Sequence, residues 1–265
     1  MDNNLIYIYC LSESQPQCDL PADISDLNVL KVMDFCVYLK PVSEEEFSEE
    51  NFKKNLSDIK WLETNAREHI SVISRIMENA AVIPFKFGTI FFSEERLNKF
   101  ISSYSDSLVE NFRQIKGKEE WSVRIYCDLN ALSQEVSHLS EEVSNLENQI
   151  KSSLPGKAFL LNRKKTELIQ KETERLCNHY GQEYFNEYNR ISDSTSLNNL
   201  LPEELTGRKE KMILNAACLV RKENVDAFRG KADEIFKKDG TLGFSIEVTG
   251  PWPAFSFISL NEKVL

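Results

Sequence analysis

The sequence has few of the residues on which catalysis and metal binding usually depend. It contains only three histidines, and none has a second ligand four positions on, as in the HExxH zinc motif. A GxSxG nucleophile motif is absent, and no glycine cluster has the spacing of a phosphate-binding loop. We therefore expect no catalytic residue, no metal site and no bound cofactor.

The sequence also lacks the marks of a secreted or membrane-spanning protein. Its six cysteines include no CxxC pair and are spread from position 10 to position 218, so a dense disulfide framework is not expected. The opening MDNNLIYIYC has no basic segment of a signal peptide, and no apolar run reaches the ~18–20 residues of a membrane span. These absences predict a cytoplasmic protein with buried, reduced thiols.

The chain has fewer basic than acidic residues. The chain has 32 Lys and Arg against 42 Asp and Glu, which gives a net charge of -10. Nucleic acids and anionic membranes both attract basic surfaces, so neither a nucleic acid nor a lipid membrane is an expected partner. The 265 residues include 16 Phe and 8 Tyr, which is too aromatic for a disordered chain and enough for one large or two small domains.

Hydrophobic periodicity in residues 1–117 predicts an N-terminal α+β domain. Apolar residues at spacings of three and four predict a single long helix over residues 52–77, and Pro84 requires its strand to be an edge or to be bulged. The predicted elements are a strand at 5–11, a hairpin at 29–32 and 35–39, a short acidic helix capped by Ser43, the helix at 52–77, a strand at 81–87, and a helix from Ser93 to Gly117.

Residues 118–265 predict a second domain whose elements follow the βαββαβ order of a ferredoxin-like sandwich. In its first strand Trp121, Ile125 and Cys127 alternate with polar residues and are expected in the core. The predicted elements are a strand at 121–127, a heptad-patterned helix at 132–150, a helix at 159–188, strands at 194–201 and 212–221, a helix at 224–238, and a strand at 243–249. The fold class is therefore α+β with two domains, a long helical hairpin at about 130–190 and an extended tail over residues 250–265.

The tail contains two prolines that enclose a tryptophan. Pro251 and Pro253 lack amide donors, and Trp252, Phe255 and Phe257 offer a large apolar surface. Two interpretations remain open, a tail packed across the protein's own core and an exposed aromatic strip that binds a partner. We hypothesise that Trp252 anchors the turn between the domains and that the Phe residues lie near a binding site.

Three blocks of the sequence resemble the gas vesicle accessory proteins of the F/L type. The first runs from Trp61 through Arg67 and His69 to the segment VIPFKFGT, the second begins at GKEEW before its strand, and the third runs from LVR to TGPWPAFSF. The signature residues on which the likeness rests are Trp61, Arg67, His69, Pro84, Phe87, Gly88, Thr89, Trp121, Gly250, Pro251, Trp252, Pro253, Phe255 and Phe257.

The resemblance implies a non-enzymatic role in building gas vesicles, as an assembly factor or minor shell component in the cytoplasm. It implies that the partners are the hydrophobic main wall protein and other gas vesicle accessory proteins. Two alternatives remain, a ligand-sensing regulator built on ferredoxin-like domains and an uncharacterised enzyme. A concave pocket with convergent polar groups would favour the regulator, whereas the missing catalytic constellation counts against the enzyme.

Overall fold

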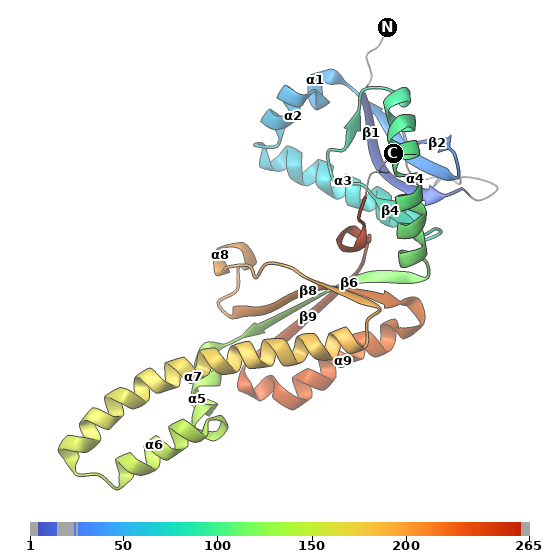
Figure 1. The fold of residues 1–265 in the computed structure, drawn as a ribbon. Helices are drawn as coiled ribbons and strands as arrows, with labels where there is room; N and C mark the ends of the chain where they lie inside the picture. Colours follow the sequence, from blue (N-terminus) through green and yellow to red (C-terminus); the bar gives the residue numbers. More distant parts are fainter. Residues whose placement is uncertain (1–4, 15–23, 25, 261–265) are drawn as a thin grey trace. The chain divides into compact units, whose positions relative to one another are not determined.

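The chain forms two compact units in a computed structural model that describes residues 5–14, 24 and 26–260 (Figure 1). The first unit runs to Glu120 and takes in the tail from Pro251, and the second runs from Trp121 to Gly250. The sequence analysis instead ends the first domain at residue 117 and assigns the tail to the second. The tail groups with the first unit because Ala254 and Ile258 pack into its hydrophobic core.

An antiparallel sheet in the order β2-β3-β1-β4, with β5 also paired to β1, forms the centre of the first unit. The elements of this unit are β1 (Leu5–Glu13), β2 (Asn28–Val32), β3 (Phe35–Val42), α1 (Glu44–Phe47), α2 (Glu49–Asn55), α3 (Ile59–Met77), β4 (Val82–Pro84), β5 (Ile90–Phe91), α4 (Glu94–Ile115) and the 3-10 turn η3 (Phe255–Phe257).

Strand β1 is buried on both faces, as its nearly all-apolar sequence predicts. Ile8 and Leu11 belong to a core cluster that includes α4, whereas Tyr7 and Cys10 belong to a second cluster that includes Ile73 of α3. Side chains alternate between the faces of a strand, and an irregularity between Ile8 and Cys10 shifts the alternation by one residue, so one strand contributes to both cores. The sheet is therefore covered by α4 on one face and by α3 on the other.

The predicted helix over residues 52–77 is wrong, because the chain breaks into α2 and α3. The Asp58 side chain accepts hydrogen bonds from the backbone N–H groups of Lys60 and Trp61, at 2.9 and 3.2 Å. This N-cap satisfies donors at the start of α3 and fixes a new helix start inside the periodic pattern. Ser43, by contrast, makes no side-chain capping bond to α1.

The strand expected at residues 81–87 is shorter than predicted. Strand β4 ends at Pro84, which lies on the edge of the sheet, so the prediction of an edge position for this proline is confirmed. Proline has no N–H to donate to a further strand, and β5 then pairs with β1 at a separate point.

The second unit contains an antiparallel sheet in the order β7-β8-β6-β9, packed against α7 and α9 (Figure 1). Its elements are β6 (Lys118–Cys127), α5 (Leu129–Leu139), α6 (Glu141–Lys151), α7 (Pro155–Arg190), β7 (Ser194–Leu197), α8 (Glu203–Thr206), β8 (Lys211–Arg221), η1 (Lys222–Asn224), α9 (Val225–Asp239), η2 (Gly240–Leu242) and β9 (Phe244–Trp252).

Several boundaries in this unit differ from the sequence-based expectation: β6 begins at Lys118, α7 begins at Pro155, and β7 ends at Leu197 rather than at residue 201. The heptad helix at 132–150 is interrupted at Ser140, whose extended backbone separates α5 from α6. Strand β9 continues to Trp252 rather than ending at Thr249. Pro251 is tolerated there because β9 is an edge strand.

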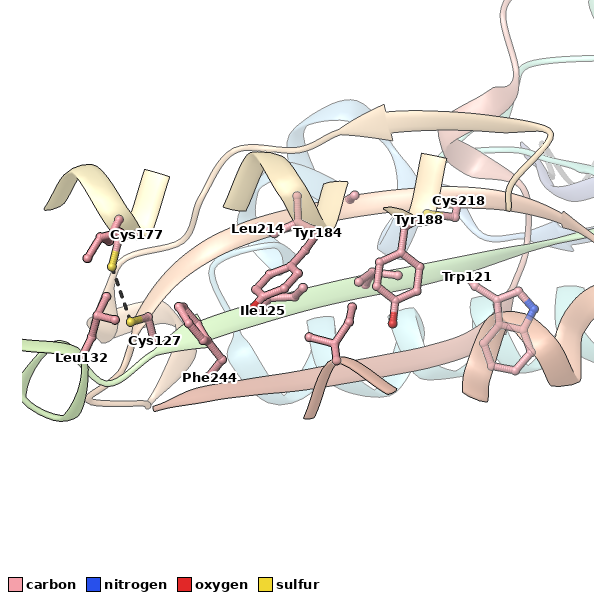
Figure 2. Close-up of a cluster of buried hydrophobic side chains, with 14 of the residues drawn as sticks. Trp121, Ile125, Cys127, Leu132, Cys177, Tyr184, Tyr188, Leu214, Cys218 and Phe244 are labelled. Carbon is pink, nitrogen blue, oxygen red and sulfur yellow. Dashed lines mark hydrogen bonds between the residues drawn. The ribbon is translucent and has the colours of Figure 1, made fainter. Parts of the chain in front are cut away.

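The core of the second unit contains the side chains that the alternation in β6 predicts. Trp121, Ile125 and Cys127 are all buried in one cluster with residues of α7 and β9, which Figure 2 shows. The Cys177 thiol lies 3.4 Å from the Cys127 sulfur, and both cysteines are free. Cys36 of the first unit is disulfide-bonded, so the expectation that all thiols are reduced is wrong.

Candidate functional site

His69 on α3 lies at the centre of a buried hydrogen-bond network in the first unit. Its Nε2 is 2.9 Å from the Phe85 carbonyl oxygen, and its Nδ1 is 2.8 Å from the Tyr7 hydroxyl. A carbonyl only accepts, so Nε2 carries the proton and Nδ1 accepts from Tyr7. The Tyr7 oxygen in turn accepts from the Gly88 N–H at 3.4 Å. The neutral imidazole therefore links α3, β1 and the segment after β4.

Burial lowers the pKa of His69, although the Phe85 carbonyl and the charge of Glu68 act in the opposite direction. Burial likewise raises the pKa of the Tyr7 hydroxyl. Both shifts favour the neutral forms, in which every polar atom of the pair has a partner. This arrangement is that of a structural linkage rather than of a proton-transfer site.

Glu68, the neighbour of His69, pairs with β-sheet residues. Its carboxylate forms an ion pair with Lys40 and accepts a hydrogen bond from the Tyr9 hydroxyl at 3.0 Å. Burial alone would raise the pKa of Glu68, but Lys40 and the Tyr9 hydroxyl outweigh it and lower the pKa. Helix α3 is thus fixed to β1 and β3 by polar contacts as well as by apolar packing.

An aromatic cluster surrounds this network and extends to the surface. Phe47, Phe52, Trp61 and Phe87 contact one another with ring centroids 5.6–6.2 Å apart. Phe52, Trp61 and Phe87 are half-buried. The Trp61 Nε1–H donates to the Glu46 carboxylate at 2.6 Å, which satisfies the one polar atom of the indole. We call these four rings the aromatic cluster.

Gly88 is required at its position for two independent reasons. Its φ of +81° lies in the left-handed region, where side chains with a Cβ are strained. A Cβ added there would also lie 2.4 Å from Cζ of Phe52, well inside van der Waals contact. The signature glycine therefore allows the chain to turn directly against the aromatic cluster.

The segment that leaves the cluster carries partly exposed apolar side chains on both faces of the sheet, since Phe87 and Ile90 pack on the α3 side and Phe91 on the α4 side. Phe87, Ile90 and Phe91 are half-buried, and Phe92 is 67% exposed. Within this segment the Thr89 hydroxyl donates to the Lys86 carbonyl at 2.7 Å and holds the turn. We call residues 87–92 the edge segment, because β5 lies within it on the same side of β1 as the edge strand β4.

Arg67 and Trp121, although they belong to the signature, lie outside the aromatic cluster. Arg67 forms an exposed ion pair with Glu63 one turn earlier on α3. Trp121 is buried in the core of the second unit, with the Arg229 guanidinium 5.6 Å from its ring centroid.

The tail packs on the cores of the first unit through Ala254, Phe255 and Ile258. Phe257 is buried at 8% exposure and Phe255 is half-buried, whereas Trp252 is 42% exposed. The Ser256 backbone N–H and hydroxyl both donate to Glu120, at 2.9 and 2.7 Å. Pro253 is buried as well. Ser256 thus ties the tail to Glu120, and Ala254 and Ile258 pack into the core of the same unit.

The remaining signature residues of the tail, Gly250 and Pro251, are exposed at the end of β9. Further along, the Ser259 N–H donates to the Asn111 side chain at 3.0 Å, which ties the tail to α4. Burial raises the pKa of Glu120, while the two bonds from Ser256 act to lower it.

Sequence analysis missed the contributions of Phe47, Phe52 and Tyr7 to this site. The spacing of apolar residues predicts only that Phe52 lies on the apolar face of a helix. No residue near Phe52 in the sequence indicates its contact with Gly88. The acidic residues around Phe47 indicate a solvent-exposed helix, so the sequence does not predict that the Phe47 ring is buried.

A shallow open pocket of about 470 Å³ lies along α3, lined by residues that include Glu68, Ser71, Arg75 and Glu78. Arg75 and Glu78 already pair with each other at 2.5 Å. In the described ranges 5–14, 24 and 26–260 there is no group of three side chains suited to a metal ion. No helix in the same ranges is long and apolar enough to cross a membrane.

Two antiparallel sheets with helices packed on them define an α+β protein. The crystal structure of the gas vesicle protein GvpF from Anabaena sp. PCC7120 superposes on 98% of this chain and 98% of its own, with a TM-score of 0.68 and 18% identity. GvpF from Microcystis aeruginosa matches 97% of this chain and all of its own, with a TM-score of 0.65 and 17% identity. These likenesses establish the fold.

The family follows from the sequence comparison. Residues 5–259 match the model of the gas vesicle synthesis proteins GvpL/GvpF, so the chain belongs to this family. Gas vesicle protein L of a Streptomyces species is 23% identical over 82% of this chain and 77% of its own length. Gas vesicle protein L of Haloferax mediterranei is 22% identical over 66% of this chain and 55% of its own length.

Proposed function

We propose that this protein is a non-enzymatic assembly factor or minor shell component of gas vesicles that binds the hydrophobic wall protein. Membership of the gas vesicle synthesis family supports a role in making the vesicle. The described site supports binding rather than catalysis, because the polar groups around His69 satisfy one another and leave none aimed at a substrate.

The edge segment is the surface that we assign to the wall protein. The observation that carries this assignment is the partial exposure of Phe87, Ile90 and Phe91 together with the 67% exposure of Phe92. Exposed apolar runs of this kind mark protein-binding surfaces. An edge strand also offers unpaired backbone groups to an incoming extended segment.

In this proposal Gly88, Pro84 and His69 act as positioning residues for the edge segment. Pro84 ends β4, Gly88 turns the chain against Phe52, and the His69 linkage holds the Phe85 carbonyl. The second unit, whose strand order we interpret as ferredoxin-like, would carry contacts to other gas vesicle accessory proteins.

Co-purification from cells that express the wall protein tests the assignment. Phe92→Ser should reduce the wall protein recovered with the tagged full chain by about tenfold, since burying a Phe side chain contributes about 1.5–3 kcal/mol. Leu205→Ser is the matched control, because Leu205 on α8 is 72% exposed and lies outside the edge segment. Equal recovery with the two variants would contradict the assignment.

A further inference from the structure

The outer face of α7 combines exposed apolar and basic residues. Helices α5, α6 and α7 form an arm that extends from the sheet of the second unit (Figure 1). Phe159 and Leu160, in the first turns of α7, are 73% and 67% exposed. Residues 151–171 contain six basic residues and one acidic residue, a net charge of +5 in a chain of net charge -10. Charge is therefore strongly segregated along the molecule.

The helical register places these residues on the side of α7 away from α6. Lys165 forms an ion pair with Glu147 of α6 at 2.8 Å, which identifies the inward side. With 3.6 residues per turn, Phe159, Leu160 and Arg163 lie on the opposite side. Together with Lys157 and Lys164 they make up what we call the basic face.

The three cations of the basic face are not neutralised by the part of the chain that the structure describes. Lys157, Arg163 and Lys164 are exposed, and none has an ion pair among the described residues. Phe159 and Leu160 are adjacent exposed apolar residues with cations around them, and apolar patches with a polar rim mark interaction sites. The partner should carry apolar groups with carboxylates around them.

Such a surface exists on the first unit of the same chain. Residues 44–50 contain five glutamates and no basic residue. Glu49 pairs with Lys53 and Glu46 with Trp61, whereas Glu44, Glu45 and Glu50 are exposed without an ion pair among the described residues.

Two exposed apolar residues follow these glutamates closely in the chain. Leu56 directly after α2 and Ile59 at the start of α3 are exposed, Ile59 at 79%. We call Glu44, Glu45, Glu50, Leu56 and Ile59 the acidic face. Residues 44–59 contain six acidic and two basic side chains, a net charge of -4, which is opposite in sign to the charge of the basic face.

We propose that the basic face of one copy binds the acidic face of a second copy, so that the protein associates head to tail. The two faces lie on different units and are not the same surface, so the contact is heterologous. Each bound pair leaves one basic and one acidic face free, and further copies can add. Association at so small and charged a surface is expected to be weak and salt-sensitive.

Sedimentation velocity of the full chain provides the first test. At low salt the average sedimentation coefficient should rise with protein concentration, and it should return to the monomer value in about 500 mM NaCl, where the Debye length is only a few Å. A monomer at all concentrations up to about 200 µM would overturn the proposal, because an interface of this kind should bind within that range.

Two variants locate the contact. The basic-face variant carries Phe159→Ser with Arg163→Gln, and the acidic-face variant carries Glu45→Gln with Glu50→Gln. Each variant alone should remain monomeric at the protein concentrations at which the unmodified chain associates. An equimolar mixture should form a dimer that grows no further, since only one intact face of each kind remains. Because these side chains are exposed, circular dichroism should show both variants folded.

The matched control replaces two exposed lysines elsewhere, Lys222→Gln with Lys237→Gln, and should associate like the unmodified chain. Persistent association of either face variant alone, or a mixture that stays monomeric, would refute the pairing.

Binding to anionic lipid vesicles is the alternative that must be tested separately. If vesicles of phosphatidylcholine with phosphatidylserine capture the unmodified chain but not the basic-face variant, the basic face binds an anionic surface and the proposal is wrong.

Discussion

Replacing Gly88 with alanine tests the two reasons why glycine is required at this position, its positive φ and its close approach to the Phe52 ring. The backbone cost of a positive φ for a residue with a Cβ is about 1–2 kcal/mol. The new Cβ would also lie 2.4 Å from the Phe52 ring, and relieving such overpacking typically costs a further ~1–3 kcal/mol. We therefore expect Gly88→Ala to lower the free energy of unfolding of the first unit by about 2–5 kcal/mol.

Gly117→Ala is the matched control for the backbone cost alone. Gly117 has φ of +74°, but a Cβ there would meet no atom within 4 Å. Urea unfolding followed by circular dichroism should place the midpoint of Gly88→Ala clearly below that of Gly117→Ala. Because the chain has two units, the transition should be fitted as more than one step.

A double-mutant cycle tests the contact with Phe52 directly. Phe52→Leu removes the ring edge that Gly88 approaches, so the pair of substitutions should cost less than the sum of the two. If Gly88→Ala is no more destabilising than Gly117→Ala, or if the cycle is additive, the close approach of Gly88 to Phe52 is not an energetic constraint and our reasoning fails.

Three further predictions concern His69, the second core and the tail. Since the folded state lowers the pKa of His69 below its unfolded value of about 6.5, the unfolded chain binds the extra proton, and stability should be full above that pH and fall as the pH drops below it. His69→Gln should flatten this fall in thermal melts between about pH 7.5 and 5.5, and an unchanged slope would argue against a buried neutral imidazole. Trp121→Ala should destabilise the second unit by about 3–5 kcal/mol in urea titrations, because the ring is buried, and an unshifted midpoint would contradict the packing. Phe257→Ala should lower the melting temperature more than Trp252→Ala, the reverse of what the tail sequence alone suggests, and the opposite ranking would place the anchor at Trp252.

The sequence predicts elements best where a local pattern decides them. Helix α4 has both an N-cap at Ser93 and a glycine at 117, and β6 alternates strictly, so their existence and buried faces follow from neighbouring residues. Predictions fail where one capping residue competes with a periodic stripe. Asp58 interrupts a stripe of apolar residues whose spacing alone would continue the helix.

The candidate site could be predicted only in part. Pro84 and Gly88 indicate an edge and a tight turn through their own backbone chemistry. The contact between Gly88 and Phe52, and the packing of Ala254 and Ile258 into the core of the first unit, depend on tertiary contacts between distant positions. No local pattern encodes such contacts, and residues adjacent in sequence, such as Trp252 and Pro253, differ in burial for the same reason.

Hydrogen–deuterium exchange of the full chain with and without the wall protein tests the central claim most directly. We predict that binding slows amide exchange in residues 86–92, where the edge segment offers an apolar run and an open strand edge. Exchange in α8, around the equally exposed Leu205, should not change. Protection that appears elsewhere while residues 86–92 exchange as before would contradict our assignment of the wall-protein surface.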